Sequence, residues 1–87
     1  MYTQARISLV CTYDSEADAA YIYLDHPLTR GASERVTPFD TGHGMFNLDI
    51  SAEGHALGLE IIGARKHLPP TLLKAILDQQ EQNKNDQ

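Results

Sequence analysis

Three carboxylates stand at alternate positions, Asp14, Glu16 and Asp18, between two runs of apolar and aromatic residues. Oxygen ligands spaced in this way are typical of a calcium-binding loop, but such a loop needs a glycine where Ala19 stands and a bidentate glutamate where Asp25 stands. A hairpin turn explains the stretch better, because the side chain of Asp14 can accept backbone N–H groups two residues further on while the carboxylates stay in water. The sequence therefore predicts a turn here and not a metal site.

Histidines could also bind a metal, provided that they converge in space. The chain has four of them: His26, His43, His55 and His67. In the hairpin expected over residues 45–62, His55 lies at the turn and His43 beyond the open end, roughly 20 Å away at about 3.3 Å per strand residue. His26 precedes a proline and is expected in a turn, and His67 precedes the expected helix and should lie at a cap or in solvent. We therefore expect no metal and no other cofactor.

The remaining reactive residues do not form a catalytic pattern. Cys11 lies inside an expected strand, without the helix N-terminus or cationic neighbour that would lower its pKa, and no serine stands in a nucleophile elbow. Asp49 and Glu60 could pair diagonally on the outward face of the second hairpin, where exposed carboxylates are common. We expect no catalytic residue. The alternative hypothesis is a small-molecule or metal-dependent activity that uses acidic and histidine residues at a subunit interface.

Size and charge exclude several classes of protein. A chain of 87 residues makes one domain, and about 60–65% of its surface can be buried. A net charge of -5 with scattered basic residues argues against nucleic-acid binding. No signal peptide and no run of about 20 apolar residues is visible, and one cysteine suits a reducing compartment. We expect a cytoplasmic protein that binds neither nucleic acid nor membrane.

Alternation of apolar residues predicts two hairpins. In the first, a strand from Ile7 to Tyr13 pairs with "AYIYLD", Cys11 stands opposite Ile22, and residues 14–19 form the loop. The second is "MFNLDISAEGHALGLEII", with a four-residue loop from Ser51 to Gly54 that uses Gly54 for a left-handed position. The register expected for the second hairpin pairs Ile50 with His55, Leu48 with Leu57, and Phe46 with Leu59.

The other segments complete the expected fold. A short strand near Glu34 to Thr37 is confined to an edge or ended by Pro38. Pro69 and Pro70 suit the first turn of a helix whose apolar stripe should cover the sheet; the stripe consists of Leu72, Leu73, Ile76 and Leu77. The prediction is an α+β protein with an antiparallel sheet of four to five strands, built from two β-hairpins, and one C-terminal α-helix packed on one face. Residues 1–78 would form the domain and residues 79–87 a disordered polar tail.

The face of the sheet away from the helix is the expected interface. Tyr21 and Tyr23 lie on it, and tyrosine is favoured at protein interfaces, although it also suits the pleat of a solvated sheet. One helix leaves this face and at least one strand edge uncovered, and an uncovered edge attracts another strand. We expect a homodimer, with a further protein partner as a second option. The candidate interface residues are Val10, Tyr21, Tyr23, Met45 and Ile62, and the residues expected to serve the turns are Asp14 and Gly54.

Taken together, the two hairpins resemble a family of small bacterial proteins known as domain of unknown function 2283. The residues that carry the resemblance are Tyr13, Asp14, Glu16, Ala17, Asp18, Ala19, Asp49, Gly54, Gly58, Glu60, Ile61 and Ala64. The chain departs from the family pattern at Ser15, where proline is frequent, at Ala20, where a larger apolar residue is usual, and in the inserted "TGHG". The resemblance implies a sheet-plus-helix domain without an established activity, cofactor or catalytic residue, and some relatives resemble partners of toxin-like proteins. We therefore expect a non-catalytic interaction or structural module, with a toxin-like protein as one candidate partner.

Overall fold

Five strands form one antiparallel sheet in the computed structural model, which describes residues 1–40 and 45–85. The strands are β1 (Cys11–Asp14), β2 (Ala19–Tyr23), β3 (Ser33–Asp40), β4 (Met45–Ser51) and β5 (Ala56–Ile62). Their order across the sheet is β1-β2-β5-β4-β3, so β1 and β3 are the edges. Two helices follow, α1 (Ala64–His67) and α2 (Pro70–Asn85). The predicted α+β class is confirmed, but the described part of the chain has two helical segments where one was predicted.

The register predicted for β1 and β2 is confirmed, since Cys11 pairs with Ile22. The predicted start of the first strand at Ile7 is wrong, because β1 begins at Cys11. The last hydrogen bond of this ladder runs from the N–H of Tyr23 to the carbonyl of Val10. Beyond this bond, the N–H groups of Leu24 and Asp25 both donate to the carbonyl of Leu57 in β5, so Asp25 does not continue the ladder with β1. Residues 7–9 therefore extend past the point where β2 could pair with them.

The register predicted for β4 and β5 is wrong by two residues. Leu48 pairs with Leu59 and Phe46 with Ile61, in place of the predicted Leu57 and Leu59. Because this displacement is even, the side chains of Phe46, Leu48 and Leu59 still lie on the face predicted for them.

A tight turn and a β-bulge explain this displacement. Ser51 belongs to β4, and its N–H donates to the carbonyl of His55, so Ile50 pairs with Ala56 and not with His55. The register then shifts between Asp49 and Ile50, as happens where two residues of one strand oppose one of the other. Gly54 has a φ of 84°, the left-handed conformation that this turn needs.

The third strand lies at an edge, as Pro38 indicated, but it does not end there. β3 spans Ser33–Asp40 and includes Pro38, which stands opposite Asn47 of β4. Proline has no N–H to donate, so it is tolerated in a strand that has a neighbour on one side only.

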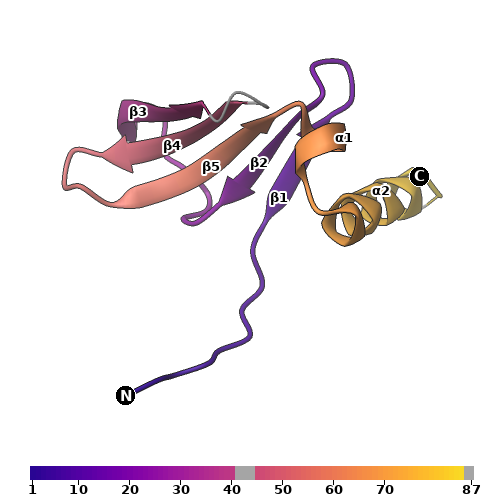
Figure 1. Ribbon diagram of the computed structural model, residues 1–87, viewed down its shortest axis with the longest axis horizontal. Helices are drawn as coiled ribbons and strands as arrows, with labels where there is room; N and C mark the ends of the chain where they lie inside the picture. The colour runs from indigo at the N-terminus through magenta and orange to yellow at the C-terminus, as the bar shows by residue number, and fades with distance from the viewer. Residues whose placement is uncertain (41–44, 86–87) are drawn as a thin grey trace.

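The core is small and lies at one end of the sheet. Figure 1 shows both helices gathered beside β1 and β2, with β3 and β4 at the opposite end. The buried apolar residues are Ala20, Leu57, Ile61, Ala64 and Leu68. The half-buried residues packed around the main cluster are Tyr13, Ile22, Phe46, Leu72, Leu73 and Ile76. The helical stripe therefore covers part of the sheet, and Leu77, which was expected in that stripe, is exposed.

Helix α2 continues to Asn85, past the domain boundary predicted at residue 78. The predicted disorder of residues 79–87 stays a prediction. Neither described helix is long and apolar enough to span a lipid bilayer.

Asp18 ties the first loop of the sheet to the start of α1. Its φ is 51°, and its carbonyl accepts the N–H groups of Gly63 and Ala64, both at 2.9 Å. Its Oδ1 accepts the hydroxyl of Tyr13 at 2.9 Å and the N–H of Arg65 at 3.0 Å. The prediction that all three loop carboxylates stay in water is therefore wrong for Asp18, which satisfies backbone donors at the beginning of a helix.

Replacing Asp18 with alanine should lower the free energy of unfolding by about 2 kcal/mol, because two hydrogen bonds to a charged carboxylate are lost and alanine tolerates a left-handed φ poorly. Urea denaturation followed by circular dichroism measures this change. Glu16→Ala in the same loop is the control, since Glu16 is exposed and its loss should change stability little. Equal stability of the two variants would contradict the role of Asp18.

Candidate functional site

The face of the sheet opposite the helices, here called the open face, carries most of the predicted interface. Met45 stands directly opposite Ile62, and the two side chains are 42% and 37% exposed. Tyr21 and Tyr23 of β2 share this face and are half-buried. Val10 is exposed and lies opposite Tyr23, whose N–H its carbonyl accepts. The fold thus places the five candidate residues on one face, with Val10 beside Tyr23 and Met45 beside Ile62, while their role in an interface stays a prediction.

An aromatic ladder crosses one end of the open face. The ring centroids of Tyr21 and Tyr23 are 4.7 Å apart, and those of Tyr23 and His26 are 4.9 Å apart in an edge-on arrangement. Tyr21 lies over Gly58 so closely that a Cβ at position 58 would clash with the tyrosine ring. A glycine inside a strand is the sequence signal for such a close approach, and it could have predicted this contact.

Hydrogen bonds hold the polar groups of the open face. The hydroxyl of Tyr21 donates a short bond to Oδ2 of Asp49, and the hydroxyl of Ser33 donates to Oδ1 of the same carboxylate at 3.2 Å. The amide nitrogen of Asn47 donates to Glu60 at 2.8 Å. Burial and the Asp49 carboxylate both raise the pKa of Tyr21. The phenol thus stays protonated, and both carboxylates already act as acceptors, which suits a rigid binding surface better than acid–base chemistry.

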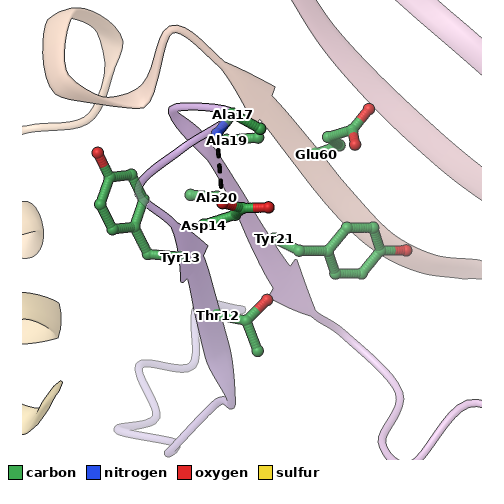
Figure 2. A pocket seen from close by; sticks show the side chains of 8 residues that line it. All are labelled: Thr12, Tyr13, Asp14, Ala17, Ala19, Ala20, Tyr21 and Glu60. Carbon is green, nitrogen blue, oxygen red and sulfur yellow. Dashed lines mark hydrogen bonds between the residues drawn. The ribbon is translucent and has the colours of Figure 1, made fainter.

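A shallow pocket opens between β1, β2 and β5 (Figure 2). Its lining residues are Thr12, Tyr13, Asp14, Ala17, Ala19, Ala20, Tyr21 and Glu60. The rings of Tyr13 and Tyr21 point in opposite directions, toward the two faces of the sheet. One oxygen of the Asp14 carboxylate serves the turn, because Oδ1 accepts the N–H of Glu16 at 2.9 Å and of Ala17 at 3.2 Å. These bonds are the ones that a turn stabilised by Asp14 requires.

Possible metal ligands do not gather within the described residues. His26 packs against the aromatic ladder, and His55 follows the β4–β5 turn; His43 lies outside the residues that the structure describes. In residues 1–40 and 45–85, no group of three or more histidine, cysteine, aspartate or glutamate residues could hold a metal ion.

His67 is packed against the sheet, and its expected position at a cap or in solvent is wrong. The residue ends α1, and its Nδ1 lies 3.1 Å from the carbonyl of Ile62, which places a proton on Nδ1. The ring meets Phe46 edge-on at a centroid distance of 5.8 Å. Its Nε2 is buried without a hydrogen-bond partner in the part of the chain that the structure describes. His67 therefore belongs to the packing between α1 and the sheet.

Cys11 is half-buried in β1 and forms no disulfide. Burial raises the pKa of its thiol, so the reactive thiolate is disfavoured. This agrees with the expectation that Cys11, inside a strand, has no neighbour that would lower its pKa.

Comparison with known proteins gives a family but no activity. A family model described as "Protein of unknown function (DUF2283)" matches residues 11–65. The matched segment begins with β1 and ends inside α1, so it contains the whole sheet and the Asp18 contacts but not α2. Neither the curated proteins nor the solved structures contain a match to the chain.

Asp14→Ala should lower the free energy of unfolding by about 0.5–2 kcal/mol, the usual cost of losing a side chain that accepts backbone N–H groups. Asp14→Asn is the matched control and should retain most of the stability, because the amide oxygen is still an acceptor. Thermal and urea unfolding measure both variants. An Asp14→Ala protein as stable as the original chain would show that the turn does not depend on this carboxylate.

The stability of the chain should fall as the pH rises above about 10, the ordinary pKa of tyrosine. A raised pKa in the folded state means that Tyr21 stabilises the fold below that pH, because the unfolded chain releases its proton first. Tyr21→Phe should therefore weaken the alkaline loss of stability, while Tyr2→Phe, at an exposed position, should leave it unchanged. Urea titrations between pH 8 and 11 provide the measurement, and an unaltered pH dependence in Tyr21→Phe would count against the proposed hydrogen bond.

Proposed function

The chain belongs to the DUF2283 family, whose function is not known, and we propose that this member is a non-catalytic protein-interaction module that works as a homodimer. The observation that carries the proposal is the large surface of the chain compared with its core. The five buried apolar residues of the described chain include no aromatic side chain. A protein with so small a core gains stability when a partner covers further apolar area.

The excess of surface can be expressed as an area. The chain exposes 6929 Å², whereas a compact monomer of 9.7 kDa exposes about 5,100 Å². Its radius of gyration is 14.4 Å, against about 12 Å for a compact domain of this length. Extended residues 1–10 contribute to both differences. The excess of about 1,800 Å² is more than twice the roughly 800 Å² that one partner buries in a standard interface.

The open face supports binding of a second, different protein. Its tyrosines are held by ring contacts and by the Tyr21–Asp49 hydrogen bond, so little side-chain entropy remains to be lost on binding. Met45 and Ile62 add exposed apolar area, and tyrosine and methionine are both enriched at interfaces. Carboxylates of this face would favour a basic partner, in line with the net charge of -5.

Family resemblance adds a toxin-like protein as one candidate for this partner. We place the protein in the bacterial cytoplasm, because a single cysteine without a disulfide suits a reducing compartment.

The alternative, a small-molecule or metal-dependent activity, would need residues from two copies of the chain. Asp49 and Glu60, the carboxylates considered for it, are engaged by Tyr21, Ser33 and Asn47. Geometry within one chain therefore favours the interaction module.

Light scattering coupled to size-exclusion chromatography tests the homodimer. At micromolar concentration the mass should be twice the 9.7 kDa of one chain and should fall toward that value on dilution. A mass of one chain that stays constant over a tenfold rise in concentration would refute self-association.

A further inference from the structure

The face that carries the helices also carries an apolar strip that the helices do not reach. The strip consists of Phe39, Leu48, Ile50 and Leu59, which the strand registers place on the same side as the buried Ile61. Phe39 is 48% exposed, and the other three side chains are half-buried. None of the four belongs to the core cluster that the helices cover.

The position of the helices explains why no helix covers the strip. Hydrogen bonds to Asp18 hold the start of α1 beside the β1–β2 loop. Helix α2 then lies against β1. Figure 1 shows β3 and β4 at the other end of the sheet, away from both helices. One half of this face is thus covered by helices, and the other half presents apolar side chains.

The distribution of charge favours the strip over the open face as the contact between two copies. Among the residues that the registers pair directly on β3, β4 and β5, those on the strip's side of the sheet include Arg35 and Thr37 but no carboxylate, while Glu34 lies at the irregularity between Ser33 and Arg35. The open face carries Asp49 and Glu60. Two copies that each have a net charge of -5 would bring like charges together if they met through the open face, which is unfavourable.

We propose that the strip is the dimerisation surface and that its occupant is the strip of a second copy, packed sheet against sheet around a two-fold axis. The inference deepens the homodimer proposed above and rests on it. A two-fold contact uses the same patch on both copies, and two apolar sheet faces pack about 10 Å apart. The chain as a whole exposes about 1,800 Å² more than a compact monomer, part of it from residues 1–10, against the roughly 800 Å² that each partner of a stable pair needs to bury. The open face, with its tyrosines, then remains available in the dimer.

Two substitutions on the same edge strand test the proposal. Phe39 points to the strip side and Val36 to the open face, and the two are 48% and 57% exposed. Phe39→Asp should weaken dimerisation at least about tenfold, because it places a charge in an apolar contact. Val36→Asp adds the same charge to the same strand and should leave the dimer unchanged. Light scattering over a dilution series measures both, and circular dichroism checks that both variants fold.

Cross-linking gives a measurement that does not depend on the folding of Phe39→Asp. In a Cys11→Ser background, which removes the free native thiol, Thr37→Cys places one cysteine beside the strip and Val36→Cys places one on the other face. A short bis-maleimide should join two copies of the Thr37→Cys protein much faster than two copies of Val36→Cys.

The outcomes separate this inference from the homodimer itself. A monomeric original chain would overturn both. A dimer that tolerates Phe39→Asp, or that cross-links through position 36 faster than through position 37, would overturn the strip and leave self-association standing. Dissociation by Phe39→Asp alone, with preferential cross-linking at position 37, supports the strip as the contact.

Discussion

The contacts of Asp18 determine how the rest of this chain is arranged. One residue of the β1–β2 loop accepts four hydrogen bonds, two through its carbonyl from Gly63 and Ala64 and two through its carboxylate from Tyr13 and Arg65. Backbone N–H groups at the start of a helix need acceptors. Here the acceptor is Asp18, which lies 47 positions before Arg65 in the sequence. The chain leaving β5 is thereby held against the β1–β2 loop.

An uneven sheet follows from this arrangement. The helices lie over the β1–β2 end, where Ala20, Ile61, Ala64 and Leu68 are buried, and the β3–β4 end receives no comparable cover in the described chain. A two-layer α+β domain buries the apolar face of its sheet against helices, so a half-covered sheet leaves apolar area that another molecule can cover. The large surface of the protein results from this half-covered sheet together with the extended residues 1–10.

The two faces of the sheet differ in chemistry, and this difference supports separate roles. On the open face, the polar groups satisfy one another through the Tyr21–Asp49 and Asn47–Glu60 hydrogen bonds, and the close approach of Tyr21 to Gly58 holds the aromatic ladder in place. On the helix side, the area that the helices leave uncovered includes the apolar strip together with Arg35 and Thr37. The family match ends at residue 65, so it includes both surfaces and the Asp18 contacts, which are therefore the features to examine in other members of the family.

Local pattern alone determined the features that depend on neighbouring residues. Alternation predicted the pairing of Cys11 with Ile22, and Pro38 indicated an edge strand. Parity placed Phe46, Leu48 and Leu59 on the correct face even though their pairing was wrong by two residues. The local pattern also indicated that Asp14 could accept the N–H groups of its own loop.

Tertiary structure decided the features that depend on residues distant in sequence. Asp18 and Arg65 are 47 positions apart, and no local pattern links a loop carboxylate to a helix that follows the last strand. The β4–β5 register depends on a bulge near Leu57, whose carbonyl receives N–H groups from Leu24 and Asp25 at the end of β2. The N–H of Asp25 donates to β5 and not to residues 7–9, so the alternating pattern of that segment does not continue the ladder with β2. Periodicity shows which side of an element is apolar, but only contacts between elements decide which part of that side is covered.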